Sequence, residues 1–228
     1  MSRRFLFFSI ALFFMSQLMA QVNFMVGYDL GIRKLEEINR NITRYNAENA
    51  SISKKMPLMW NMSGLDLGVK YKLDFISLEG HYITRFKVGR SRQNVNDETL
   101  KNDVKMNDQS YNFGLTLNLK RFGIGSNYEN HSFRFSRKFS DDKKYIEAFD
   151  PKLNYNAINL FLDFRFKLSD LIGFHVRPYY QFALNGADNI SNSLVASNLK
   201  LNAMAEADAA TKWNMFGIKF LFSNGRQD

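Results

Sequence analysis

Eight stretches of this chain alternate apolar and polar side chains with a period of two, and the connections between them alternate in length. A period of two is typical of a β-strand whose two faces meet different surroundings. In the stretch from Gly173 to Gly186 the even-numbered residues are mostly apolar, while the odd-numbered ones include His175 and Arg177. One such strand fits a soluble sheet with its apolar face on a core, and equally a membrane barrel with that face on lipid. The rest of the chain must decide between the two.

The alternation predicts strands at approximately residues 22–32, 58–72, 75–88, 111–120, 122–139, 158–168, 173–186 and 215–222. Three irregularities interrupt it. The apolar phase changes near Ser63 and Gly64 and again at Phe133 and Phe135, and we expect a β-bulge at each place. A third bulge is expected at Pro178, because the proline ring removes a backbone donor from the ladder.

The connections favour a membrane barrel. Residues 73–74, 120–123 and 169–173 form short turns, whereas residues 33–57, 89–109, 138–153 and 186–210 form long loops. In an up-and-down meander this order puts every long loop at one end, and every turn with both termini at the other. That asymmetry is typical of bacterial outer-membrane barrels. A soluble barrel of the lipocalin kind is the main alternative.

Strand length and composition also favour the membrane. The regular stretches reach 11 or more residues, enough for a tilted strand to cross hydrocarbon. The polar faces carry many glycines and charges, which suit the narrow interior of an eight-stranded barrel better than the outside of a soluble sheet. Lys219 and ten further residues are therefore predicted to lie in the lumen: Asp29, Asp66, Glu79, His81, Arg85, Glu129, Asp163, Arg165, His175 and Arg177. Eight strands leave room only for side chains, so we expect these groups to pair and fill the lumen, although a conducting pore is the alternative.

The chain begins with an apolar run behind Arg3 and Arg4, which is typical of a secretory signal. We expect residues 1–20 to be this signal, residues 21–222 to form one barrel domain and residues 223–228 to be a short tail. The run is too short for a membrane-spanning helix, which needs about 20 apolar residues.

Composition excludes several functions. The chain has 31 basic and 22 acidic residues, but the excess of positive charge is spread out and no basic run alternates with aromatics, so a nucleic-acid partner is not expected. Without cysteine it has no disulfide and no thiolate metal site. No metal site or cofactor is predicted. The only histidines, His81, His131 and His175, are all on the lumen parity, where they cannot form a Ser/His/acid set facing lipid, so an enzyme is not expected.

The first long loop, residues 33–57, contains a helical pattern. Leu35, Ile38, Ile42 and Tyr45 recur at helical spacing, with charged residues on the other faces. We expect a short amphipathic helix that folds over its own barrel; docking on a partner is the alternative.

The sequence as a whole resembles the small eight-stranded outer-membrane barrels of the OmpA-transmembrane-domain and OmpX type. Its first predicted strand, "QVNFMVGYDLG", follows directly on the signal, and its last, "MFGIKFLF", is similar to the assembly signal of such barrels at Gly217, Phe220 and Phe222. Met215 and the trailing "SNGRQD" depart from that pattern. The resemblance implies location in the cell outer membrane, contact with membrane lipid and lipopolysaccharide, and recognition by the outer-membrane insertion machinery.

The leading functional hypothesis is a non-catalytic outer-membrane barrel that presents structured extracellular loops, with an envelope-structural or surface-interaction role. The alternatives are a soluble carrier of an apolar ligand, a lipid-modifying enzyme of the outer membrane, and an accessory subunit of a secretion or assembly complex. The sequence names no ligand and no other protein partner.

Overall fold

The computed structural model describes residues 22–49, 51–73, 75–96, 98–147, 153–184, 199 and 213–225. The predicted signal at residues 1–20 and most of the predicted loop 186–210 lie outside this part of the chain. The elements are β1 (Val22–Arg33), α2 (Glu36–Glu48), β2 (Ile52–Lys54), β3 (Asn61–Leu73), β4 (Ile76–Val95), β5 (Glu98–Leu119), β6 (Phe122–Lys138), β7 (Ile146–Glu147), β8 (Leu153–Lys167), β9 (Ile172–Ala183) and β10 (Met215–Asn224).

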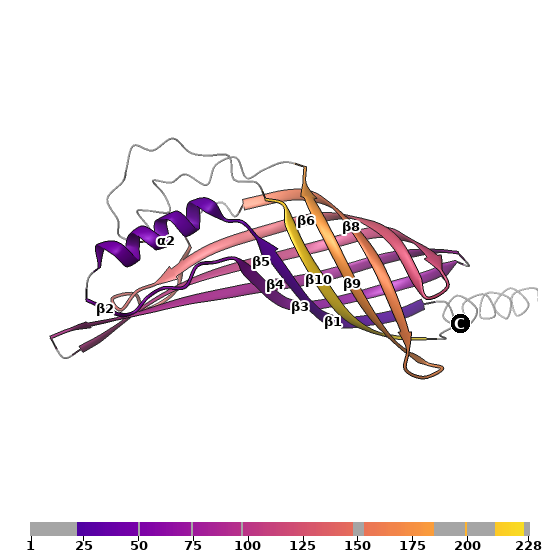
Figure 1. Cartoon of the computed structure of the whole chain (residues 1–228), viewed down its shortest axis with the longest axis horizontal. Coiled ribbons are helices and arrows are strands. Elements are labelled where there is room, and N and C mark those ends of the chain that lie inside the picture. Colours follow the sequence, from indigo (N-terminus) through magenta and orange to yellow (C-terminus); the bar gives the residue numbers. More distant parts are fainter. Residues whose placement is uncertain are drawn as a thin grey trace, which may run out of the picture.

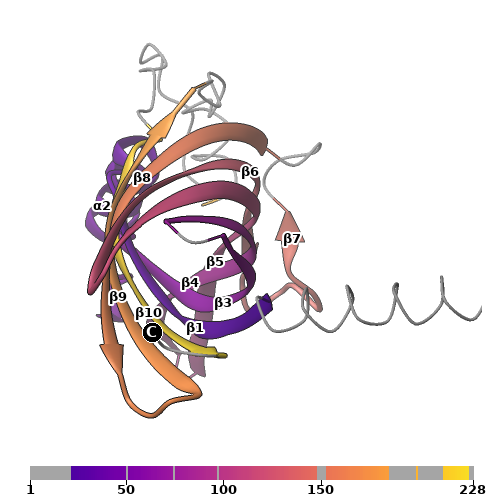
Figure 2. The same cartoon turned by 90° about the vertical axis from the view of Figure 1, so that its right-hand side faces the viewer.

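Within the described residues, eight long antiparallel strands close into a ring in the order β1-β3-β4-β5-β6-β8-β9-β10 (Figures 1 and 2). β1 closes the ring, because it pairs with β3 on one side and with β10 on the other, from Met25↔Ser223 to Arg33↔Met215. The short β2 and β7 pair with β4 and β6. The predicted eight-stranded up-and-down barrel, with a short helix in its first long loop, is confirmed.

The two ends of the barrel differ as the loop lengths predicted. Tight turns join β3 to β4, β5 to β6 and β8 to β9. Val22 and Asn224, the outer residues of β1 and β10, lie at this same end, where they pair with Tyr71 and Ile172 next to the turns. The opposite end carries the long connections, including α2. β10 extends to Asn224, two residues beyond the end expected for the last strand.

The second long connection is a β-hairpin, which corrects the loop expected at residues 89–109. β4 continues to Val95 and β5 begins at Glu98, and their register is unbroken from Ile76↔Leu117 to Val95↔Glu98. Asn96, with φ 48°, turns the chain in the left-handed region that asparagine tolerates. This hairpin projects beyond the other strands (Figure 1). The sequence did not predict this hairpin because the outward side chains of the hairpin are polar. The apolar alternation that identified the other strands is therefore missing.

Two of the expected bulges are absent. β3 pairs with β1 and β4 without a register shift through Ser63 and Gly64, and β6 pairs continuously with β5 through Phe133 and Phe135. Both phenylalanines, and Met62 at the start of β3, lie on the interior face and are buried. The apolar phase changes at these points because the interior itself becomes apolar at the loop end of the barrel, while the strand geometry stays regular.

The third expected bulge, at Pro178, is also absent. β9 pairs with β10 without a shift through Pro178↔Ile218. Its pairing with β8 stops at Phe161↔Tyr179 and resumes at Phe164↔Val176 in the same register. The barrel therefore accommodates the missing proline donor by omitting two pairs of one ladder, without inserting a residue.

The barrel wall is apolar outside and charged inside. Arg85, Asp163 and Arg177 are each at most 2% exposed and face the barrel axis, whereas large outward residues such as Phe24 and Phe113 are more than 60% exposed. This polarity is the reverse of what a soluble carrier of an apolar ligand requires. A closed antiparallel ring with an apolar outer band matches the barrels of bacterial outer membranes, where lipid surrounds the wall and every backbone group is satisfied within the ring. The chain is an outer-membrane β-barrel.

The close approach of β3 and β4 provides a test of this packing. A Cβ atom on Gly64 would lie 1.7 Å from the carbonyl oxygen of Thr84, whereas one on Gly80, which faces outward, would lie 3.8 Å from its nearest neighbour. Gly64→Ala is expected to lower the free energy of unfolding by about 1–3 kcal/mol, because the backbone must move to admit the methyl group. Urea titration of the barrel in lipid vesicles measures the change. Gly80→Ala is the control and should alter stability little; equal effects of the two variants would contradict the packing described here.

Candidate functional site

Arg177 on β9 holds the charged lumen together. Its guanidinium donates to Glu79 through Nη1 at 2.6 Å and Nη2 at 3.0 Å, and to Asp163 through Nε at 2.8 Å and Nη2 at 3.1 Å. All three side chains are buried. β9 and β4 lie on opposite sides of the eight-strand ring, so the Arg177–Glu79 pair spans the lumen. Bidentate pairing of this kind suits the planar guanidinium group, and a lysine could not reproduce it.

Further polar groups complete the shells of these two carboxylates. Lys70 on β3 lies 3.1 Å from Glu79 and 3.6 Å from Asp163, and the hydroxyl of Thr116 donates to Glu79 at 2.9 Å. Arg165 donates from Nε to Asp163 at 2.9 Å. The end of the lumen nearest the turns is thus filled by side chains from several strands, in which anions and cations alternate.

A second group of charges occupies the middle of the lumen. Arg85 donates to Asp29 at 2.8 Å and lies 3.6 Å from Asp108, and the hydroxyl of Tyr179 donates to Asp29 at 2.7 Å. Lys219 on β10 reaches Asp66 at 3.3 Å. His131 of β6 and Tyr155 of β8 also bond to Asp108, so all eight strands of the ring contribute to this group or to its direct partners. The group therefore connects distant parts of the chain.

Each histidine lies between two oxygen-bearing side chains. His81 is 2.6 Å from Asp66 and 3.4 Å from Glu79, and His131 is 3.0 Å from Asp108 and 2.9 Å from Glu129, measured between ring nitrogens and carboxylate oxygens. These two histidines therefore connect carboxylates of neighbouring strands that would otherwise repel each other inside the lumen.

His175 forms a different arrangement, with the spacing of a nucleophilic triad. Its Nδ1 is 2.9 Å from Oδ1 of Asp163, and its Nε2 is 2.9 Å from Oγ of Ser223. A serine, a histidine and an aspartate in this order can activate the serine hydroxyl. Here, however, Ser223 is only 3% exposed, and Asp163 also accepts bonds from Arg177 and Arg165. The geometry is that of a buried hydrogen-bond chain facing neither lipid nor solvent.

An apolar cap closes the loop end of the lumen. Leu35, which precedes α2, and Ile38, Ile42 and Tyr45 of α2 are buried, which confirms that the predicted helix folds over its own barrel (Figure 1). These side chains form one buried cluster with residues of the strand extensions, of the segment before β3 and of the connection between β9 and β10: Met56, Met59, Met62, Val104, Met106, Phe133, Phe135, Phe139, Tyr155, Ala157, Leu199 and Trp213.

Arg33 lies at the boundary between the cap and the charged lumen. It bonds to Asp108 at 3.3 Å and to the hydroxyl of Tyr155, and its guanidinium carbon is 5.2 Å from the ring centroids of both Tyr155 and Trp213. One face of this cation therefore meets aromatic rings and its edge meets a carboxylate, so it joins the two zones.

The predicted lumen residues do come together inside the barrel. All are buried except Arg165, which is half-buried near a turn, where it bonds to Asp163 and Asn118. Sequence reasoning missed Arg33 and Asp108, because both were assigned to loops, and it omitted Lys70. The signal for Asp108 was present, since Val104, Met106, Asp108 and Ser110 continue the parity of Asn112.

The three residues of the predicted assembly signal lie on both faces of β10. Gly217 faces the lumen, where a Cβ atom would lie 2.3 Å from the Tyr179 ring, while Phe220 and Phe222 are on the outer face and stack near Phe174. Their role in recognition by the insertion machinery stays a prediction.

Within the described ranges, no group of three or more His, Asp or Glu side chains has the arrangement of a metal site. Among the same residues, no helix is long and apolar enough to cross a membrane.

Comparison with known proteins shows likeness of fold only. No protein-family model and no curated protein matches the chain. Solved structures similar to it include the attachment invasion locus protein Ail of Yersinia pestis, in complex with the heparin analogue sucrose octasulfate (9% identity, 89% of this chain and 96% of that one, TM-score 0.46). Others are Neisserial surface protein A (7%, 88% and 96%, TM-score 0.41) and the outer membrane protein OprG from Pseudomonas aeruginosa (11%, 89% and 94%, TM-score 0.39).

The Arg177 pairs give the second prediction. Arg177→Met removes the guanidinium but keeps most of its volume, so Glu79 and Asp163 lose their main partner inside the barrel. We expect a loss of about 3–5 kcal/mol in the free energy of unfolding, because buried carboxylates are left poorly compensated. Urea titration in vesicles provides the measurement.

Arg134→Met is the matched control for this variant. Arg134 pairs with Glu147 at 3.4 Å on the barrel surface, where both side chains are about a third or more exposed. Loss of this surface pair should lower the free energy of unfolding by less than about 1 kcal/mol. The double variant Arg177→Met/Glu79→Gln should recover part of the stability. A single variant as stable as the control would show that the lumen does not depend on Arg177.

Proposed function

We propose that this chain is a non-catalytic, non-conducting outer-membrane barrel that presents a rigid extracellular platform for surface interaction. The observation that carries the proposal is the filled interior: a charged network spans the lumen and an apolar cap covers its loop end. The barrel thus supplies an anchor and a support, and the extracellular part supplies the contact surface.

The interior supports a closed lumen on both electrostatic and steric grounds. An ion pathway needs a column of water, but eight-stranded barrels have an interior just wide enough for side chains. Here Arg177 reaches Glu79 across the ring, and Arg85 joins Asp29 and Asp108 further along the axis. Opening a path would separate ion pairs that are buried together, which is costly.

The extracellular part supports the platform. The hydroxyl of Tyr45 on α2 accepts a bond from Asn102 at 2.7 Å and lies 3.2 Å from Oγ of Ser91, which fastens the helix to the β4–β5 hairpin. Asn46 exchanges two hydrogen bonds with the backbone of Met56, at 2.8 and 2.9 Å. A surface ordered in advance loses little conformational freedom when a partner binds.

The closed lumen predicts a lack of conductance. Purified barrel reconstituted into planar bilayers should give no discrete current steps above the protein-free bilayer, because side chains occupy the space that a conducting water column would need. Arg177→Met/Glu79→Gln, which removes the pair spanning the lumen, is the comparison variant. Regular current steps from the unmodified protein would contradict the proposal.

The Ser223–His175–Asp163 arrangement provides the test of the non-catalytic part. A fluorophosphonate probe labels serines whose hydroxyl is activated and accessible, so the intact barrel is expected to give no more label than Ser223→Ala or His175→Ala. A soluble serine hydrolase in the same detergent serves as the positive control. Labelling that disappears in both variants would instead favour a lipid-modifying enzyme.

A further inference from the structure

One strand of the barrel has an open edge near the loop end. β4 pairs with β5 along its whole length, but on its other side the pairing with β3 ends at Ser63↔Phe86 and the pairing with β2 begins only at Lys54↔Arg92. Among the described residues, no strand pairs with residues 87–91 on that side. An unpaired strand edge presents backbone N–H and C=O groups, with which an extended chain can pair.

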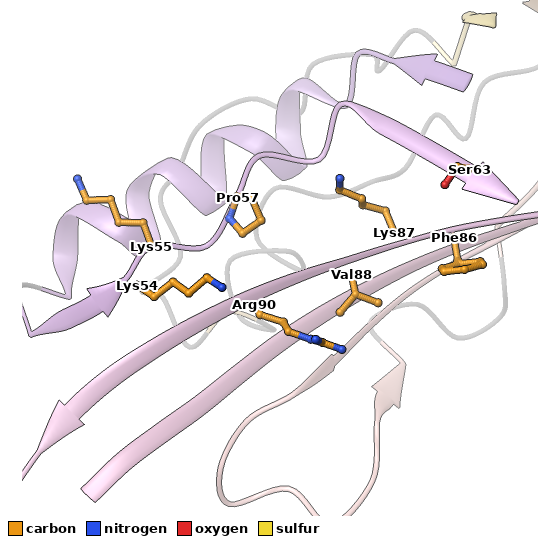
Figure 3. Close-up of a pocket in the computed structure, with 8 residues that line it drawn as sticks. All are labelled: Lys54, Lys55, Pro57, Ser63, Phe86, Lys87, Val88 and Arg90. Atoms are coloured by element: carbon orange, nitrogen blue, oxygen red, sulfur yellow. The ribbon is translucent and has the colours of Figure 1, made fainter. Parts of the chain in front are cut away.

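A groove runs along this open edge. Its volume is about 480 Å³, and Figure 3 shows that the segment from β2 to β3 borders it on one side and β4 on the other. The lining residues are Lys54, Lys55, Pro57, Ser63, Phe86, Lys87, Val88 and Arg90. The groove therefore occupies the place that a neighbouring strand would fill.

The lining of the groove attracts anions. Four of its eight residues are lysine or arginine, and none is acidic. Lys87 donates to the neutral side-chain amide of Asn61 at 2.8 Å. Arg90 lies 3.7 Å from the carboxylate of Asp103, which Arg92 shares at 3.1 Å. One carboxylate shared between two arginines does not neutralise the set, so the groove keeps a net positive charge.

We propose that this groove binds an acidic segment of a partner protein in extended conformation, as an added strand beside residues 87–91 of β4. The open edge supplies hydrogen bonds to the backbone of such a segment, and the cations of the groove pair with its carboxylates. Both features together favour a peptide over a lipid headgroup, because a headgroup uses the cations but leaves the strand edge unpaired. The proposal rests on the surface-interaction role proposed above and gives the partner a chemical class.

The groove also limits the length and the pattern of the bound segment. Paired strands run residue for residue, so the open edge accommodates about five residues of a partner strand before the pairings with β3 and β2 close its ends. Successive side chains of a strand point to opposite faces. Acidic residues at alternate positions therefore share the outer face, on which the exposed side chain of Arg90 lies.

A short acidic peptide tests the charge part of the proposal. The probe is a fluorescent eight-residue peptide that alternates glutamate with threonine, and its binding to the purified barrel in detergent micelles is measured by fluorescence anisotropy. The variant Lys54→Gln/Lys55→Gln/Arg90→Gln removes three charges of the groove. It is expected to bind the peptide about tenfold or more weakly than the unmodified protein, because several cations act on one acidic segment.

The matched control is Lys101→Gln/Lys143→Gln/Lys144→Gln, which removes three exposed charges that do not line the groove. It should bind the peptide within about twofold of the unmodified protein, since salt screens charges that lie away from the site. Gel mobility before and after heating confirms that each variant is a folded barrel. Equal binding by the groove and control variants would overturn the proposal.

A backbone-methylated form of the same peptide tests strand addition separately from charge. N-methylation at alternate residues keeps every carboxylate but removes the N–H groups that pair with the strand edge. Binding should therefore weaken by about tenfold, the effect of losing one or two hydrogen bonds. Equal binding of the two peptides would show that the cations accept any anion, a lipid headgroup included, and that no strand is added.

Amide hydrogen exchange locates the bound peptide. Alternate amides of residues 87–91 should exchange more slowly in the complex, because alternate N–H groups of a strand point to each of its two neighbours, whereas the amides of residues 98–100 on β5 should not change. Unchanged exchange at residues 87–91 under saturating peptide would contradict the proposal. None of these measurements reports on conductance or on serine labelling, so failure here is distinguishable from failure of the proposed function.

Discussion

Hydrocarbon offers no hydrogen bonds to a polypeptide backbone, and this constraint determines the architecture of the whole chain. The first and last strands must pair, and they do so along nearly their full length, from Met25↔Ser223 to Arg33↔Met215. Once the ring is closed, the side chains have only two environments, lipid and lumen. The inverted polarity of the wall follows directly, since apolar residues can face acyl tails and ionised residues cannot.

Closure of the ring buries the charged side chains inside the barrel, where each charge needs a partner of opposite sign. Carboxylates and cations from strands far apart in sequence are brought within a few ångströms of one another, without bulk water around them. Each of two arginines pairs with two carboxylates at once. Arg177 donates hydrogen bonds to Glu79 and Asp163, and Arg85 forms ion pairs with Asp29 and Asp108. The packed lumen therefore stabilises the barrel, and it suits the proposed role of a membrane anchor better than that of a channel.

Polarity inverts a second time where the strands leave the membrane. Along β5 the outward residues change from Tyr111 and Phe113 to Asp103 and Lys105, while the inward ones change from Asn112 to Met106 and Val104. Beyond the lipid the extended strands and α2 form an ordinary hydrophobic core with a polar outside. Arg33 joins the two zones, because it contacts both Asp108 and the Trp213 ring. The extracellular platform is therefore built like a soluble domain that grows out of a membrane barrel.

The sequence by itself determined the number of long strands, their direction, the face of each that meets lipid and the helix of the first loop, because period-two and helical patterns are local and strong. It did not determine how the patterns end. Three predicted bulges were wrong and the β4–β5 hairpin was missed, since a change in apolar phase has the same signature whether the strand bends or its surroundings change. Partners such as Arg177 and Glu79 are 98 residues apart, so only closure of the ring decides that they meet. The gap along β4 between its pairings with β3 and with β2 likewise depends on where those two strands end and begin, which no local pattern encodes.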